Sequence, residues 1–216
     1  MYIPASFRES DRAVLFDFLE AHALGALISG APGGKTALYA THLPLWLDRE
    51  RGVLEGHLAL ANPHAKHLTQ LDAGAQVLVI FTGPDAYISP GWYPGKHEHG
   101  KAVPTWNYIA VHVHGTFRMR DDREFLMTHL ERLTTVHEAT QSPSWTMAEA
   151  PAAYIEQMAR AIVGIEISID VLEGKFKMSQ NRSDADIDGV VRGLSASSDA
   201  TAHEVAAHVA ARKPVR

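Results

Sequence analysis

Thirteen histidines make metal binding the first chemistry to consider. The densest pairs are His97 with His99 and His112 with His114. Residues two apart on a strand share a face, so His112 and His114 could bind one ion together. Because the spacing fixes no third ligand, we predict no metal site and place most histidines at the surface or along a barrel wall.

An anion site is indicated where a strand that begins near Gly56 runs into a helix that begins at Asn62-Pro63. Asparagine is a good N-cap, and proline suits the first helical turn. Free backbone N–H groups and the helix dipole attract an anion at such a start, and Lys66 adds a full charge. An ordinary capped surface helix is the alternative on this segment alone.

Three other segments carry more polar and aromatic residues than folding requires. Residues 83–93 hold three aromatics among glycines and prolines, which can line a pocket for a flat ligand. Residues 103–108 offer stacking surface and fixed hydrogen-bond groups. Residues 175–182 combine two lysines and an arginine with neutral polar residues, a set that suits a phosphate or a ring edge. The alternative for residues 83–93 is a rigid loop whose aromatics cover the core. For residues 103–108 it is packing at a sheet edge, and for residues 175–182 it is a solvated turn.

The composition excludes several classes of protein. The 216 residues contain no cysteine, which excludes disulfides, thiolate catalysis and iron–sulfur clusters. A P-loop, a G-x-G-x-x-G turn before a helix and a G-x-S-x-G motif are also missing, so triphosphatase and hydrolase functions lose support. The net charge of -5 is unfavourable for direct nucleic-acid binding. Without a signal-like start or a bilayer-length apolar run, we expect a cytoplasmic protein with no membrane partner.

Short strands and turns must position these segments, with helices later in the chain. Helices are predicted over 11–23, where Asp11 can serve as the cap, and over 62–71, 121–137, 149–160, 184–194 and 201–211. Strands are predicted over 24–29, 36–47, 53–58, 76–81, 86–89, 105–118 and 161–175, with a turn over 30–35 and a loop over 90–103. Apolar and polar residues alternate along 105–118, as in a strand with one core face. Short strands separated by turns favour an antiparallel barrel or sandwich.

Taken in order along the chain, these segments resemble the PaiB family of FMN-binding negative transcriptional regulators. The resemblance covers nearly the whole chain, and several motifs of this length together are specific, unlike any one alone. The motifs are Met1–Phe7, Ala40–Leu45, Gly56–Ala59, Asn62–His64, Tyr87–Pro90, Trp92-Tyr93, Pro104–Tyr108, His112–Gly115, Ile162–Glu166 and Lys177–Arg182.

The resemblance implies an α+β fold, an antiparallel split β-barrel with flanking helices that is FMN-binding and pyridoxamine-phosphate-oxidase-like. Residues 1–195 would form the FMN-binding split-barrel domain with inserted helices over 121–160, and residues 196–216 a C-terminal helical tail. Such barrels are usually homodimers with FMN at the subunit interface, so a homodimer is expected.

The resemblance also implies which residues contact FMN. Thr41, His42 and Leu43 would lie along the isoalloxazine edge. Asn62, His64 and Lys66 would hold the phosphate. The pocket would be closed by Trp106, Asn107 and Tyr108, or by Lys177, Gln180, Asn181 and Arg182 from the partner subunit.

Activity is open at this point, because a fold does not determine function. The first hypothesis is an FMN-binding negative transcriptional regulator. The alternatives are an FMN-dependent oxidoreductase on a small substrate, with His42, His112 or Tyr108 as proton donor, and a haem or other planar-ligand binder. The sequence has no recognisable helix-turn-helix. Direct DNA binding would need a local basic patch, for which the candidates are Lys175, Lys177, Arg182 and Arg192, and regulation would otherwise be indirect, by sensing a flavin or by binding a partner.

Overall fold

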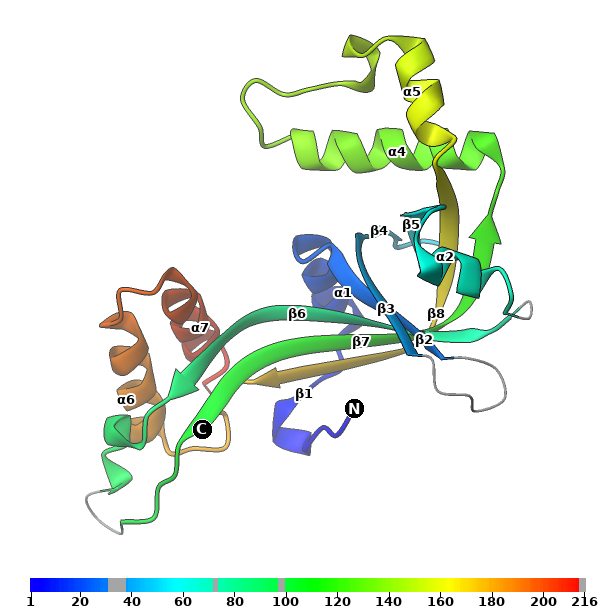
Figure 1. Ribbon diagram of the computed structural model, residues 1–216. Helices are drawn as coiled ribbons and strands as arrows, with labels where there is room; N and C mark the ends of the chain where they lie inside the picture. The colour runs from blue at the N-terminus through cyan, green and yellow to red at the C-terminus, as the bar shows by residue number, and fades with distance from the viewer. Residues whose placement is uncertain (31–37, 72–73, 97–99, 214–216) are drawn as a thin grey trace. The chain divides into compact units, whose positions relative to one another are not determined.

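The computed structural model describes residues 1–30, 38–71, 74–96 and 100–213 (Figure 1). All of the turn predicted over 30–35 except its first residue lies outside the described residues, and so does the pair His97 and His99. None of the helices described is both long and apolar enough to cross a bilayer.

Eight strands form one sheet in the described residues, and the pairings with a defined register are antiparallel. The strand order is β3-β2-β6-β7-β8-β5-β4, and β1 pairs with β8. The strands are β1 (Arg8–Glu9), β2 (Leu24–Gly30), β3 (Leu38–Pro44), β4 (Trp46–Asp48), β5 (Val53–Ala59), β6 (Gln76–Ile88), β7 (Thr105–Arg120) and β8 (Ile162–Lys177).

All six predicted helices are confirmed, with ends that differ from the predictions by at most three residues. They are α1 (Arg12–Ala21), α2 (Pro63–Leu68), α4 (Arg123–Glu138), α5 (Ala152–Ala159), α6 (Asp184–Ser195) and α7 (Ala200–Ala211). Short 3-10 helices are η1 (Ala5–Phe7), η3 (Pro90–Trp92) and η4 (Met147–Glu149). The predicted caps are also present, because Asp11 accepts from the Ala13 N–H at 2.8 Å and Asn62 from the His64 N–H at 2.9 Å.

The strand predicted over 36–47 is wrong in its extent. The described part of this segment forms two strands, β3 and β4, which are separated at Leu45. The Leu45 N–H donates to the Ala23 carbonyl at 2.9 Å, and the next residue, Trp46, pairs with Glu55 of β5. The chain therefore changes its strand partner at Leu45, which local periodicity does not reveal.

The two strands predicted over 76–81 and 86–89 are a single strand, β6. Gly83-Pro84 is a typical turn signal, because proline lacks an N–H for a ladder bond. β2 pairs with β6 only at Leu78–Ile80, so the missing N–H of Pro84 costs no bond to β2. Pairing elsewhere along the strand outweighs the local turn preference.

The chain forms two compact units, and β6, β7 and β8 contribute residues to both. Unit 1 comprises residues 1–15, 82–111 and 173–216, and unit 2 comprises residues 16–81 and 112–172. The domain boundary predicted after residue 195 stays a prediction.

Unit 2 contains the paired strands β2 and β3, β4 and β5, and β5 and the first part of β8. Its core includes fully buried side chains from four strands, namely Leu27, Val79, Phe81, Val113, Ile165 and Ile167. The register of β2 and β3 sets Thr41 opposite Leu27. The antiparallel pairing therefore fixes where the β3 side chains lie relative to β2.

Unit 1 contains α6 and α7, which pack side by side (Figure 1). Their facing side chains are buried and include Val190, Leu194, Val205 and Val209. α6 also packs on η3 through two glycines. A Cβ at Gly189 would lie 1.9 Å from the Trp92 carbonyl oxygen, and one at Gly193 would lie 2.3 Å from the Trp92 ring.

Candidate functional site

The side chains of Ser29, Thr41, Asn62 and His64, named here the Thr41 cluster, form a hydrogen-bonded group in unit 2. The Thr41 hydroxyl accepts from Asn62 Nδ2 at 3.2 Å and is hydrogen-bonded to His64 Nδ1 at 2.9 Å. His64 Nε2 is hydrogen-bonded to the Ser29 hydroxyl at 2.9 Å. The structure thus brings together three predicted phosphate- or ring-contacting residues, and it adds Ser29, which the sequence did not indicate.

His64 is the centre of this group and is only 1% exposed. Burial, with a smaller effect of His67, lowers the pKa of His64 to about 4. The Tyr39 ring stacks on both His67 and His64, with centroid separations of 4.5 and 5.4 Å. A neutral, doubly hydrogen-bonded imidazole holds α2 against β2 and β3, so His64 shapes the site and has no free ring nitrogen for an anion.

The predicted anion site at the start of α2 needs a correction. Pro63 has no N–H, and the His64 N–H donates to the Asn62 side chain. The Ala65 and Lys66 N–H groups both donate to the Asn62 carbonyl, at 2.9 and 3.4 Å. Because the helix start satisfies its own donors, its backbone offers no free cradle for a phosphate. In contrast to these backbone groups, the side chain of Lys66 is exposed and can bind an anion there.

The remaining β3 candidates face different environments. His42 is exposed, whereas Leu43 is 3% exposed and belongs to the core. Successive strand side chains point to opposite faces, which accounts for the difference. Leu43 can therefore meet a ligand only through its backbone. β2 is the only strand that pairs with β3 in the part of the chain the structure describes, so the other edge of β3 has no strand partner there.

The remaining predicted residues lie in unit 1, where the start of β7 meets the turn after β8. Lys177 Nζ donates to the Thr105 hydroxyl at 2.5 Å and to the Trp106 carbonyl. Fully buried Asn107 donates through Nδ2 to the Ser179 hydroxyl at 3.0 Å. Ser179 has a φ of 65°, a left-handed conformation that the Asn107 contact helps to hold. Asn107 and Lys177 thus tie the turn to β7.

Within the turn, the Gln180 side chain also serves the backbone. Its Nε2 donates to the Phe176 carbonyl at 2.6 Å, and its Oε1 accepts from the Met178 N–H at 2.7 Å. Asn181, the next residue, is exposed. Of the two neutral polar candidates in this turn, Gln180 fixes the loop and Asn181 faces solvent.

Cations gather around this turn and lie on aromatic rings. Lys175 Nζ lies 5.2 Å from the Tyr108 ring centroid, and the Arg182 guanidinium lies 4.7 Å from that of Tyr93. Partial burial lowers the pKa of Lys177, and the positive charges of Lys175 and Arg182 lower it further. A bound anion would relieve this repulsion, so the turn has the electrostatics of an anion-facing surface.

Sequence reasoning missed a buried ionic group in unit 2. Glu55 on β5 and Glu166 on β8 are directly opposite each other and nearly inaccessible. Arg51 donates to Glu55 at 2.8 Å and also to Glu166. Arg120 reaches Glu166 at 3.1 Å, and Arg132 lies 3.5 Å from Glu55. A glutamate flanked by apolar residues and glycine, within Val53–Gly56 and again within Ile162–Ile167, was the available signal.

A histidine pair was missed as well. His57 Nδ1 on β5 and His129 Nε2 on α4 are hydrogen-bonded at 3.2 Å. Burial lowers the pKa of both rings, that of His129 to about 4. His112 and His114, the pair that raised the question of metal, have ring centroids 6.4 Å apart, and the absence of a metal site stays a prediction.

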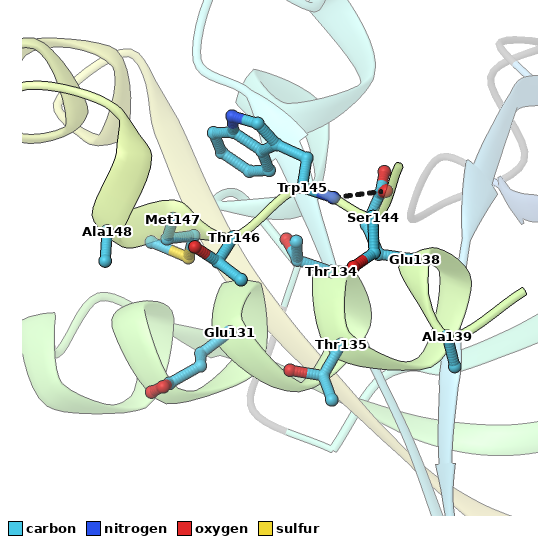
Figure 2. A pocket seen from close by; sticks show the side chains of 10 residues that line it. All are labelled: Glu131, Thr134, Thr135, Glu138, Ala139, Ser144, Trp145, Thr146, Met147 and Ala148. Carbon is cyan, nitrogen blue, oxygen red and sulfur yellow. Dashed lines mark hydrogen bonds between the residues drawn. The ribbon is translucent and has the colours of Figure 1, made fainter. Parts of the chain in front are cut away.

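A cavity of about 340 Å³ in unit 2 lies between α4 and the segment around η4 (Figure 2). Trp145 overhangs it, and the Trp145 N–H donates to Glu138 at 2.9 Å. None of the predicted flavin-contacting residues lines it. This cavity therefore does not belong to the candidate site.

The fold defines the class of protein. The solved structure of the FAD and heme binding protein from Mycobacterium smegmatis matches with a TM-score of 0.59 at 18% identity, over 84% of this chain and 78% of that chain. The antiparallel sheet with flanking helices is a split β-barrel fold, and the predicted fold is confirmed.

The sequence defines the family. Residues 1–171 match the family model described as "Putative FMN-binding domain". An uncharacterized protein of Emericella nidulans is 36% identical over an alignment that covers 90% of each chain. The Bacillus subtilis "Protease synthase and sporulation protein PAI 2" is 30% identical over 208 residues, which cover 95% of each chain. The chain belongs to the family of the "Putative FMN-binding domain" and is PaiB-like, as its motifs predict.

Proposed function

We propose that this chain binds FMN as a homodimer and acts as a negative transcriptional regulator. The observation that carries the proposal is the family match over residues 1–171, a range that contains both β3 and α2. The regulatory role follows from the resemblance of the motifs to the PaiB regulators, and the relative that supports it is the Bacillus subtilis "Protease synthase and sporulation protein PAI 2".

The donor set around β3 and α2 suits a flavin. The edge of β3 that no described strand pairs with offers backbone N–H and C=O groups, which match the alternating donors and acceptors on the pyrimidine edge of an isoalloxazine. Exposed His42 and half-buried Thr41 lie on the same strand. Lys66, on the helix that the Thr41 cluster holds against β3, supplies a cation for the phosphate. When bound, FMN would supply one- or two-electron chemistry, and the protein would bind and orient it.

The turn of Lys177, Gln180, Asn181 and Arg182 completes the proposed site from the partner subunit. Trp106, Asn107 and Tyr108 would serve in the pocket wall, with Asn107 acting through Ser179 and not by direct contact. The mutual repulsion of the cations at this turn supports an anionic partner. In this proposal each FMN is held by both chains, so binding and dimer formation are linked.

The first test measures flavin binding by the purified full-length chain. We expect yellow protein with flavin absorption bands, and equimolar uptake of FMN that exceeds the uptake of riboflavin, which lacks the phosphate. FAD serves as a comparison for the choice of flavin. The variant Lys66→Met should lower the affinity for FMN about tenfold, because one charge-assisted hydrogen bond contributes about that much to binding. Arg160→Met removes a cation from another element of unit 2 and should leave FMN affinity unchanged.

The second test separates regulation from redox catalysis. Sequence-selective, salt-sensitive retardation of DNA would support direct regulation, and capture of a defined protein partner would support an indirect route. Steady NAD(P)H consumption by the FMN-loaded protein would instead favour the oxidoreductase alternative. A Soret band in the purified protein without flavin bands would overturn the FMN proposal.

A further inference from the structure

A surface cavity of about 650 Å³ lies within unit 1, at the corner between α6 and α7. Three aromatic side chains line it, Tyr87 from β6, Trp92 from η3 and Trp106 from β7. Its volume is in the range of small-molecule sites. Of the residues predicted to contact FMN, the lining includes only Trp106.

The aromatic walls are set at defined angles. Tyr87 and Trp106 have ring centroids 6.2 Å apart and planes inclined at 76°, and they are 48% and 53% exposed. Trp92 packs closely on Gly193 of α6, where any side chain would collide with its ring, and both residues line the cavity. Two accessible rings that meet nearly at a right angle, with a third held beside them, make a concave corner of π faces.

The charged residues of the cavity have one sign. Asp85 and Asp199 line it, whereas no lysine, arginine or histidine does among its lining residues, all of which the structure describes. One oxygen of Asp199 caps α7 by accepting from the Thr201 N–H at 2.9 Å. Asp85 is exposed, and its side chain caps no helix in the contacts that the structure describes.

We propose that this cavity binds a small organic cation, an ammonium group carried on or surrounded by carbon. The negative faces of aromatic rings attract a cation, and carboxylates at the rim add Coulomb attraction and exclude anions. The same charges disfavour a phosphate, so this site is distinct from the proposed FMN phosphate contacts at Lys66 and at the Lys177 turn. The inference does not depend on FMN binding.

The test uses choline as probe and 3,3-dimethylbutan-1-ol, its neutral isostere, as matched ligand control. Binding to the full-length protein is measured by calorimetry and by saturation transfer to the ligand methyl protons. We expect choline to bind at least about tenfold more tightly than the neutral isostere. n-Butylammonium is a primary ammonium that can donate hydrogen bonds to the carboxylates, which choline cannot do through its methylated nitrogen. Comparing the affinities of the two ligands shows which feature contributes more to binding.

Two variants locate the site. Tyr87→Ala and Asp85→Asn should each weaken choline about fivefold or more, since each removes one exposed cation-attracting group. Trp145→Ala removes an exposed tryptophan that lines the unit 2 cavity of Figure 2 and should have no effect. FMN uptake is measured on the same samples, so a failure of flavin binding and a failure of the cation site are distinguished.

Two results would overturn the inference. Equal binding of choline and its neutral isostere would show a merely apolar pocket. Absence of choline binding would show that the cavity is not a cation site, and dissociation of a dimer by Tyr87→Ala would then show that a second copy of the chain covers it. Unfolding of either variant would appear in its circular dichroism, and in that case Tyr87→Leu, which keeps an apolar side chain but removes the aromatic face, and Asp85→Ser replace them, with the same expected order of affinities.

Discussion

Glu55 and Glu166 stand opposite each other on β5 and β8, and Arg51 contacts both carboxylates. Two buried like charges at cross-strand positions repel unless a cation lies between them. Arg51→Met keeps much of the side-chain volume but removes that cation, while Arg120 and Arg132 each retain one contact. We expect the free energy of unfolding at pH 7, measured in urea, to fall by about 2 kcal/mol.

The matched control lies two residues away. Arg49 makes ion pairs at 2.5 and 2.6 Å with Asp17 and Glu20, and all three side chains are well exposed. Exposed ion pairs contribute little because water and salt screen them. Arg49→Met should therefore change stability by less than about 1 kcal/mol. Equal losses in the two variants would show that the buried glutamates do not depend on Arg51.

Two buried histidines predict loss of stability in acid. The pKa of His129 is lowered to about 4 by burial first, then by His57 and Arg132, and the pKa of His64 to about 4 by burial and His67. The unfolded chain therefore binds more protons than the folded one between about pH 6.5 and pH 4. Stability is retained above pH 6.5 and falls as pH decreases through this window, by about 1.4 kcal/mol per pH unit for each histidine.

The pH dependence can be assigned with one variant. His129→Leu removes the titrating ring from α4 but retains an apolar side chain beside Phe125, which stacks on the histidine. Its unfolding free energy should depend less steeply on pH between 6.5 and 4 than that of the wild type, as measured by denaturation across a pH series. An unchanged slope would exclude His129 as a source of the acid sensitivity.

At the scale of elements, the contact between α6 and η3 depends on two glycines. Alanine in place of a helical glycine ordinarily stabilises a protein by up to about 1 kcal/mol. Here a Cβ at Gly193 would lie 2.3 Å from the Trp92 ring, and one at Gly189 would lie 1.9 Å from the Trp92 carbonyl oxygen. We therefore expect both Gly193→Ala and Gly189→Ala to lower the melting temperature.

The two glycines differ in what could relieve the collision. The ring at Gly193 belongs to a side chain, so adding Trp92→Leu should recover part of the stability lost in Gly193→Ala. The obstacle at Gly189 is backbone, so the same second substitution should give no recovery there. Comparable recovery in both double variants would mean that the helix shifts and that neither contact is specific.

The elements also show what the sequence could predict. Caps are local, so Asp11 and Asn62 marked their helices correctly. The same cap at Asn62 consumes the N–H groups that an anion site would need, and this follows only from the bonds actually made. The change of strand partner at Leu45 and the continuation of β6 through Pro84 depend on pairings between distant segments, which local preference does not encode.

The candidate site was predictable to a similar degree. Motif order placed Thr41, Asn62 and His64 in one site, and they are hydrogen-bonded together. Strand alternation along Thr41, His42 and Leu43 already implied that Leu43 and His42 face opposite sides. Ser29 gave no local signal, because its role depends on the register between β2 and β3.

At the scale of the whole molecule, the proposal predicts that each FMN uses Lys66 of one chain and Arg182 of the other. Lys66→Met and Arg182→Met each remove one charge, and methionine keeps an unbranched side chain at each position, although the contact of the Arg182 guanidinium with the Tyr93 ring is lost. Each variant homodimer should bind FMN about tenfold more weakly than the wild type.

Mixing the two variants tests whether the site is shared. In a heterodimer of Lys66→Met and Arg182→Met chains, a shared arrangement leaves one site with both native residues and the other site with neither. Heterodimers isolated with two different tags should therefore bind FMN at wild-type affinity, but at half the wild-type stoichiometry. If Lys66 and Arg182 of the same chain held the same FMN, no native site would form and affinity would stay low. That result, or a purified protein that is monomeric with FMN bound, would overturn the shared site, because a flavin held by two chains makes dimer formation part of its binding equilibrium.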